Sequence, residues 1–219
     1  LEILDIPCNQ FGGQAPGTDE EIHEHLYQCD DERLFYVYEA LCRGITPEEI
    51  NRITKIDPWF LNKLLNLVRM DNRLAEGNLT DELYLQAKKM GYLDSVITKM
   101  SGCEITNPRH CGYKMVDTCA AEFAAQTPYF YSSYDEENEA EQFIEKNGPD
   151  KPTVIVFGSG PIRIGQGIEF DYSSVHCVWA LREAGYEVVI VNNNPETVST
   201  DYTPADKLYF EPLTPEDVM

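Results

Sequence analysis

"VFGSGPIRIGQGIEFDYSSVHCVWALREAGYEVVIVNNNPETVSTD", from Val156 to Asp201, decides the fold of the second half of this chain. Its two apolar runs, "PTVIVFG" and "EVVIVNNNP", are typical of strands buried on both faces, and the segment between them has a helical pattern. A third run, "DKLYFEP", follows. A strand, a crossover helix and a second strand within about 30 residues predict a right-handed parallel unit. We therefore expect a truncated doubly wound parallel α/β domain, Rossmann-like, over residues 151–219.

Four glycines follow the first run and form a glycine-rich loop: Gly158, Gly160, Gly165 and Gly167. A dinucleotide-binding loop needs the spacing GxGxxG, and Arg163 stands where its third glycine should be. The second strand should end in an acid that binds a ribose hydroxyl, but it ends in three asparagines. No Gly-Lys-Ser/Thr closes a phosphate-binding P-loop. An NAD-binding oxidoreductase therefore stays only as an alternative hypothesis.

Carboxylates surround the same loop. Glu169 and Asp171 follow the glycines, and Glu196 lies in the loop after the second strand. Ligands of open parallel sheets bind at the carboxyl ends of the strands, so these three side chains are expected on one rim. The alternative is that Glu169 and Asp171 cap backbone amides at the start of the helix, and for Asp171 we favour it.

The first half of the chain contains the capping residues and terminal glycines that are typical of short helices. Thr18 and Glu21 form a capping box, while Thr46 precedes Pro47 and Asp57 precedes Pro58, which is the order of an N-cap and a first helical residue. Glycines at positions 44 and 91 follow apolar periodic segments as stop signals. Residues 18–102 are therefore predicted to form a compact all-helical domain.

Residues 103–150 lack a clear period and are predicted to be a bridge with an acidic linker. Residues 116–125 fit either a strand or a helix. The aromatic residues after Pro128 favour an extended segment anchored on another domain over a cofactor site. Six acids occur in the eleven residues from Asp135 to Glu145, before Gly148 and Pro149, and predict a mobile domain boundary.

Charge and hydropathy exclude several classes of partner. The formal net charge of −21 disfavours nucleic acid and anionic lipid surfaces. The closely spaced helices of residues 46–73 would fit a helix-turn-helix, but they carry five bases against four acids, far from a basic footprint. No run approaches the roughly 20 apolar residues that span a bilayer. We predict a soluble, cytoplasmic protein without nucleic-acid or membrane partners.

The seven cysteines are an odd number without a CxxC pair, which favours reduced thiols over a disulfide framework or a zinc ribbon. Cys103, His110 and Cys111 hint at a metal site, but a fourth ligand at a usual spacing is missing. The sequence therefore predicts no metal site.

Several segments resemble the large subunit of carbamoyl phosphate synthetase. "GSGPIRIGQGIEFDY", "ALREAGYEVVIVNNNPETVSTDY" and "DKLYFEPLTPEDV" are similar to the start of its second half, the pre-ATP-grasp domain. "VDTCAAEFAAQTPYFYSSY" looks like the bridge before that half, and "DERLFYVYEALCRG" with "TKIDPWFL" looks like the oligomerisation domain. "LEI" resembles the tail of the first ATP-grasp unit, so residues 1–17 are expected to be that tail and a connector.

The resemblance implies a function in the whole enzyme, a ligase. That family makes carbamoyl phosphate from bicarbonate, ammonia and two ATP, with Mg²⁺ or Mn²⁺ and K⁺, and a glutaminase small subunit supplies the ammonia. Carbamate travels through an interior tunnel, and Gly167, Glu169 and Glu196 match positions that line it. Glu2 is a further candidate, although Leu4 stands where the family has glycine.

Neither ATP-grasp core is recognisable, so the resemblance implies that this chain alone binds no cofactor, is inactive, and supplies oligomerisation and part of the tunnel wall. Both ends look cut, and we expect a sheet that lacks its later strands and exposes an edge. A non-catalytic assembly module remains a further alternative. Arginine and pyrimidine synthesis are equally compatible with these residues.

Overall fold

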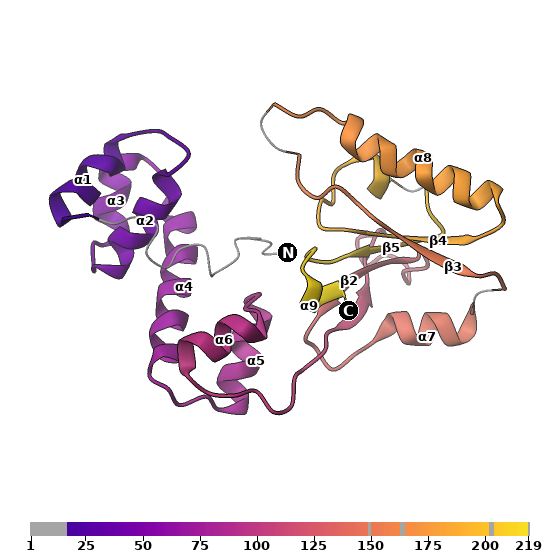
Figure 1. Ribbon diagram of the computed structural model, residues 1–219, viewed down its shortest axis with the longest axis horizontal. Helices are drawn as coiled ribbons and strands as arrows, with labels where there is room; N and C mark the ends of the chain where they lie inside the picture. Colours follow the sequence, from indigo (N-terminus) through magenta and orange to yellow (C-terminus); the bar gives the residue numbers. More distant parts are fainter. Residues whose placement is uncertain (1–16, 149, 163–164, 202–203, 219) are drawn as a thin grey trace. The chain divides into compact units, whose positions relative to one another are not determined.

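A computed structural model describes residues 17–148, 150–162, 165–201 and 204–218 (Figure 1). The chain divides into two compact units, residues 1–108 and residues 109–219. This division lies within the segment that the sequence assigns to a bridge. The predicted domain boundaries remain predictions, and each unit is described separately below.

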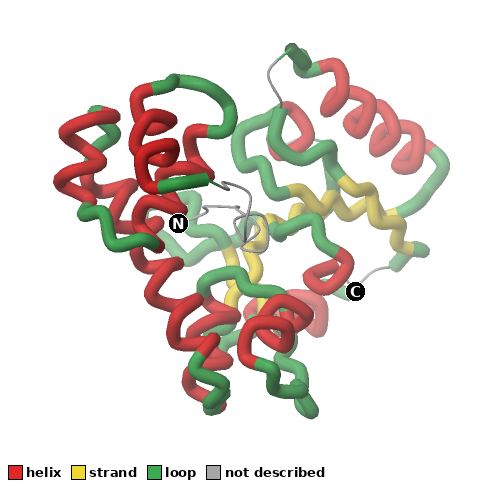
Figure 2. The backbone as a smooth tube through the Cα atoms, turned by 60° about the vertical axis from the view of Figure 1, so that its left-hand side comes forward, coloured by secondary structure: helices red, strands yellow, loops and turns green. Residues whose placement is uncertain are grey.

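The first unit is helical, as predicted, and Figure 2 shows it as a set of short helices joined by turns. The capping boxes form as expected: the Thr18 hydroxyl accepts the N–H of Glu21, the Glu21 carboxylate accepts the N–H of Thr18, and Thr46 pairs with Glu49 in the same way. The helices are α1 (Asp19–Tyr27), α2 (Arg33–Cys42), α3 (Pro47–Thr54), α4 (Pro58–Ala75), α5 (Asp81–Lys89) and α6 (Asp94–Ser101).

Helix α4 is the longest element of this unit and contributes to two apolar clusters. Toward its start, Leu61, Leu64 and Val68 pack with residues of α1, α2 and α3. Its second half packs Met70 and Leu74 with residues of α5 and α6. Apolar side chains repeat along α4 at the helical period, so one helix can bury a stripe against both clusters.

A carboxylate lies between the two clusters. Asp71 accepts hydrogen bonds from Tyr38, a member of the first cluster, and from Tyr92 of the second, at 2.5 Å for Tyr92. Burial raises the pKa of Asp71, while the two phenols act in the opposite direction. The hydrogen bonds of Asp71 therefore join the two halves of the helical unit.

The second unit contains one five-stranded sheet in the order β1-β2-β5-β4-β3. Only the β1–β2 pair is antiparallel, and the other neighbours are parallel. Together with the helices this is the mostly parallel α/β architecture that the sequence predicts. The strands are β1 (Gly112–Met115), β2 (Tyr129–Ser133), β3 (Thr153–Phe157), β4 (Glu187–Asn192) and β5 (Lys207–Phe210), and the helices are α7 (Glu139–Lys146), α8 (Glu169–Glu183) and α9 (Pro215–Val218), with a 3₁₀ turn, η2 (Val198–Thr200).

Helices α8 and α7 cover opposite faces of the sheet (Figure 1). Val178 of α8 packs with Val188 and Ile190 of β4 and with Leu208 of β5. On the other face, the rings of Phe143 in α7 and Phe130 in β2 meet at 5.6 Å. Strand β4 is buried along its length except at its first residue, as predicted for a strand with both faces covered.

The same prediction is wrong for β3. Its residues alternate between exposed and half-buried, and Ile155 and Phe157 remain 54% and 51% exposed. Strand β3 is the last strand in the described sheet, and Val156 turns toward the cluster beneath α8. The apolar run therefore identifies a strand correctly, but the described residues cover only one of its faces.

The segment predicted as bridge and acidic linker carries regular structure. Strand β2 pairs in parallel with β5, so the aromatic residues after Pro128 do form an extended segment, but this segment is a strand of the α/β unit's own sheet and is not laid on another domain. The acidic stretch is not merely a linker, because it contains α7. Asn138 caps that helix by accepting the N–H of Glu141, and acids in a first turn are favourable for the helix dipole. The ambiguous residues 116–125 contain no regular helix or strand.

Candidate functional site

The glycine-rich loop follows β3, and its first glycine packs directly against β4. A Cβ atom at Gly158 would overlap the side chain of Asn192, the last residue of β4. The Gly158 N–H donates to the carbonyl of Val191 at 2.8 Å, and Asn192 is fully buried. The glycine is therefore required for a close approach between two segments of this chain, and the space beside Gly158 is filled by a side chain.

The other three glycines have different surroundings. Gly160 has a φ of +73°, and a Cβ there would lie 3.4 Å from Oδ1 of Asn193, so a side chain would be strained. Gly165 has a φ of +86° and open space around it. At Gly167 an added Cβ would overlap the carboxylate of Glu169. Only the contact at Gly167 joins two predicted site residues.

Asp171 does not belong to an open rim of carboxylates. It is fully buried in α8, and its oxygens accept the Ser199 N–H at 2.7 Å, the Ser199 hydroxyl at 2.7 Å and the Thr197 hydroxyl at 2.8 Å. The sequence favours Asp171 as a cap for amides at the start of its own helix, and this prediction is wrong. The amide it binds belongs instead to η2, 28 residues further along the chain. Asp171 therefore ties α8 to the loop after β4.

Glu169 and Glu196 are both exposed in the described structure. The Gly167 N–H donates to Oε1 of Glu169 at 3.3 Å, which holds this carboxylate against the end of the glycine-rich loop. The Glu196 N–H donates to Oδ1 of Asn194 at 3.1 Å. Because Thr197 is bonded to Asp171, the structure brings the segments of Glu169 and Glu196 next to each other. Glu2 lies outside the described residues.

A buried cluster that the sequence did not indicate lies just after β5. Glu211 is 4% exposed, and it accepts the Tyr113 hydroxyl at 2.6 Å and the Cys111 thiol at 3.6 Å. Burial raises the pKa of Glu211 to about 7, and the negative charge of Asp217 acts in the same direction. Burial also raises the pKa of the Cys111 thiol to about 11. About 100 residues separate the partners, so no local motif could have found the cluster.

No group of three or more His, Cys, Asp or Glu side chains in residues 17–148, 150–162, 165–201 and 204–218 is placed to hold a metal ion. Among the same residues, no helix has the length and apolar character needed to cross a bilayer. Cys111, part of the suggested metal motif, instead contacts Glu211.

Comparison with known protein families matches both units. Residues 150–219 match the carbamoyl phosphate synthase preATP-grasp domain. Residues 1–114 match the carbamoyl-phosphate synthetase large chain, oligomerisation domain. The chain belongs to the carbamoyl phosphate synthase large-chain family. This membership decides against the alternative hypothesis that the chain is an NAD-binding oxidoreductase.

Individual large chains of the family are similar over nearly the whole sequence. The carbamoyl phosphate synthase large chain of Lachnoclostridium phytofermentans is 54% identical over 217 residues, which is 95% of this chain and 20% of that protein. The large chain of Methanothrix thermoacetophila is 53% identical over 224 residues, covering 99% of this chain and 20% of that protein. This chain therefore spans about a fifth of the length of these relatives.

Proposed function

We propose that this chain acts as the central part of a carbamoyl phosphate synthase large chain. It would join an oligomerisation domain to the pre-ATP-grasp domain of the second half, within an enzyme that makes carbamoyl phosphate. The observation that carries the proposal is that both units match successive domains of one family. The order of the helical unit and the mostly parallel α/β unit along the chain agrees with that match.

We propose that Gly167, Glu169, Glu196 and Glu2 line the carbamate tunnel of the whole enzyme. Three of them are described: Gly167 and Glu196 lie in loops that follow parallel strands, and Glu169 is the first residue of α8, at the edge of the sheet where α/β proteins bind ligands. Exposure of Glu169 and Glu196 in this chain supports the assignment, because a tunnel wall must offer accessible side chains. Asp171 is left out of the wall, because its three hydrogen bonds keep it buried.

The contact between Gly167 and Glu169 has a chemical consequence for that assignment. Carbamate is an anion that decomposes in water, so a carboxylate in its path is favourable only when donors hold it. The Gly167 amide is such a donor. Since a side chain at position 167 would overlap the Glu169 carboxylate, this glycine and this acid act as one element of the proposed wall.

The described residues do not fit an ATP or Mg²⁺ site. No three acidic or metal-binding side chains among them are placed around a common ion, and Asn192 fills the space beside Gly158. We therefore propose that ATP, Mg²⁺ or Mn²⁺, and K⁺ act elsewhere in the whole enzyme, and that this chain alone is inactive. We further propose that the helical unit self-associates, that a glutaminase small subunit is a partner, and that the enzyme is cytoplasmic.

The tunnel assignment can be tested in the full-length large chain that contains this segment. Glu169→Gln and Gly167→Leu are expected to leave ATP hydrolysis by the first half running while carbamoyl phosphate output falls, so that the ratio of product to ATP consumed decreases. Glu183→Gln, at the other end of α8, is the matched control and should keep the parent ratio. A parent-like ratio in both tunnel variants would contradict the assignment.

The assembly role needs a separate measurement. Sedimentation velocity of the 219-residue chain over a range of concentrations is expected to show a reversible increase in mass. A strictly monomeric chain at every concentration would contradict self-association through the helical unit, and would leave the tunnel assignment untouched.

A further inference from the structure

The helical unit exposes a pair of aromatic side chains at the start of α4. Trp59 and Phe60 are 53% and 52% exposed, and their rings meet edge to face with centroids 4.9 Å apart. The next apolar residues of the helix, Leu61 and Leu64, turn inward and are buried in the first cluster. The two aromatic rings therefore lie outside the stripe of α4 that the apolar clusters of the described residues cover.

This aromatic pair is held on an ordered helical turn. Asp57 caps α4 by accepting the N–H of Trp59 at 2.8 Å, and Pro58 is the first helical residue. The ammonium of Lys63, one turn further along, lies 5.1 Å from the centroid of the Trp59 ring, within the range of a cation–π contact. Side chains that are already positioned lose little conformational freedom on binding, and tryptophan is enriched among the residues that dominate protein interfaces.

Charge distinguishes this part of α4 from the rest of the protein. No acid occurs from Pro58 to Met70, and the two charged residues there, Lys63 and Arg69, are bases, although the chain has 38 acids and a formal net charge of −21. By contrast, residues 19–32 contain seven acids and neither Lys nor Arg. Two chains with this net charge repel each other, and the repulsion is smallest where acids are absent. The start of α4 is therefore favourable for contact with a second, acidic copy of the chain.

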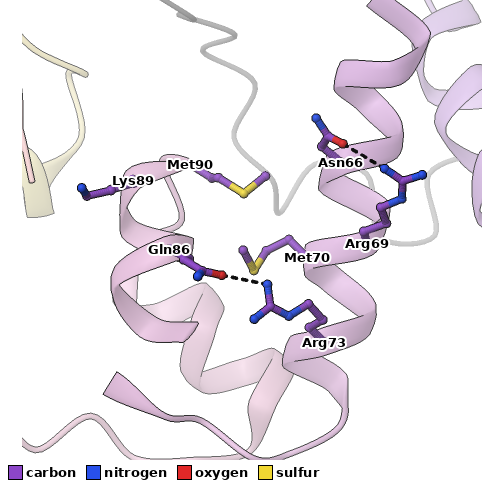
Figure 3. Close-up of a pocket in the computed structure, with 7 residues that line it drawn as sticks. All are labelled: Asn66, Arg69, Met70, Arg73, Gln86, Lys89 and Met90. Atoms are coloured by element: carbon purple, nitrogen blue, oxygen red, sulfur yellow. Dashed lines mark hydrogen bonds between the residues drawn. The ribbon is translucent and has the colours of Figure 1, made fainter. Parts of the chain in front are cut away.

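Polar side chains border the aromatic pair along the helix. Lys63 and Asn66 follow Trp59 at helical spacing and share one face of α4 with it. Oδ1 of Asn66 accepts a hydrogen bond from Nη1 of Arg69 at 3.3 Å. Figure 3 shows Arg69 directed away from α5, whereas Met70 is directed toward α5. An aromatic centre with a polar border is the usual composition of a protein–protein interface.

We propose that the aromatic pair at the start of α4, Trp59 and Phe60, is the surface through which the helical unit binds a second copy of this chain. This role rests on the self-association proposed above and adds the residues that make the contact. Residues 1–114, which include the pair, match an oligomerisation domain, so a second copy is the partner that the family match favours. The absence of acids around the pair favours the same partner.

Association and burial of the pair can be measured on the same sample. In a Trp179→Phe background of the 219-residue chain, Trp59 is the only tryptophan. As the concentration rises from about 1 μM to about 1 mM, sedimentation velocity should show an increase in mass. The emission of Trp59 should shift to shorter wavelength, and its quenching by acrylamide should fall, with the same midpoint. Added salt should strengthen the association, because it screens the repulsion between two acidic chains.

Two variants that add the same charge separate this surface from the rest of the helical unit. Phe60→Glu places an acid at the third position of α4, where a negative charge is favourable for the helix, so the unit should stay folded. It should raise the dissociation constant of the association by about tenfold or more, as expected when an aromatic anchor is lost. Leu34→Glu is the matched control, because it replaces an exposed apolar residue at the second position of α2. This control should associate like the parent.

Several results would overturn this assignment of the surface. An increase in mass without any change in Trp59 emission would place the contact elsewhere and leave the proposed self-association intact. Equal weakening by Phe60→Glu and Leu34→Glu, with the far-ultraviolet circular dichroism of both variants unchanged, would show a general effect of added charge. Short-wavelength emission and weak quenching in the dilute monomer would show that another part of the same chain covers Trp59. A chain that stays monomeric at every concentration would contradict both the surface and the self-association.

Discussion

Replacing Glu211 by glutamine should remove a pH dependence from the stability of the second unit. The carboxyl is buried after β5, and its pKa rises from 4.5 to about 7 in the folded chain. The native state therefore keeps a proton that the unfolded chain releases above pH 4.5. Because the native state binds more protons in this window, the free energy of unfolding falls as pH rises from about 4.5 to about 7.

The size of the effect follows from the same pKa values. A rise from 4.5 to about 7, at about 1.4 kcal/mol for each pH unit, corresponds to a loss of about 3 kcal/mol across the window. This is an upper limit, since water entering around a charged Glu211 would reduce the cost of its ionisation. Cys111, with a pKa near 11, stays a neutral thiol throughout.

The two tryptophans allow the second unit to be followed separately. Trp59 lies on α4 of the first unit and Trp179 on α8 of the second. In a Trp59→Phe background, denaturant unfolding followed by Trp179 fluorescence reports the second unit at each pH. Glu211→Gln should match its background near pH 4.5 and become more stable by up to about 3 kcal/mol near pH 8.

A comparison with another carboxylate isolates the effect of burial. Glu183→Gln removes an exposed carboxylate of α8, and its difference from the background should change little with pH because solvent screens that charge. A difference for Glu211→Gln that stays constant from pH 4.5 to 8 would refute the reasoning. So would a midpoint near 4.5 in a ¹³C NMR titration of the Glu211 carboxyl carbon.

Three further changes test contacts elsewhere. Asp94→Asn should destabilise the helical unit by about 2 kcal/mol, measured by denaturant unfolding in a Trp179→Phe background, because it neutralises the carboxylate 3.2 Å from the buried Lys88 ammonium. A gain in stability would contradict this. Lys55→Gly should raise the same free energy by about 0.5–1 kcal/mol, whereas Lys55→Ala should not, because Lys55 has a φ of +61°. Asp171→Ala should cost the second unit about 3 kcal/mol by leaving the buried N–H and hydroxyl of Ser199 unpaired. Faster hydrogen exchange at Ser199 would accompany that loss, and unchanged exchange would count against it.

Local sequence rules determined the elements of this protein. Thr18 and Thr46 have side chains that satisfy nearby backbone amides, so their helices begin where the sequence indicates. The continuous apolar run of β4 identifies a strand. The helix between β3 and β4 follows from a crossover of fixed hand. These features depend on neighbours along the chain, which is why periodicity and spacing predict them.

Contacts between distant segments were decided only by the tertiary structure. Ile155 is exposed because β3 lies at the end of the described sheet, although the apolar sequence of β3 is typical of a strand buried on both faces. Gly158 is needed because Asn192, 34 residues later, occupies the adjacent space, and Asp171 is a structural acid because Ser199 reaches it. The raised pKa of Glu211 likewise requires burial beside residues about 100 positions away. Burial and pairing are properties of the packed chain, so residue type and spacing alone do not specify them.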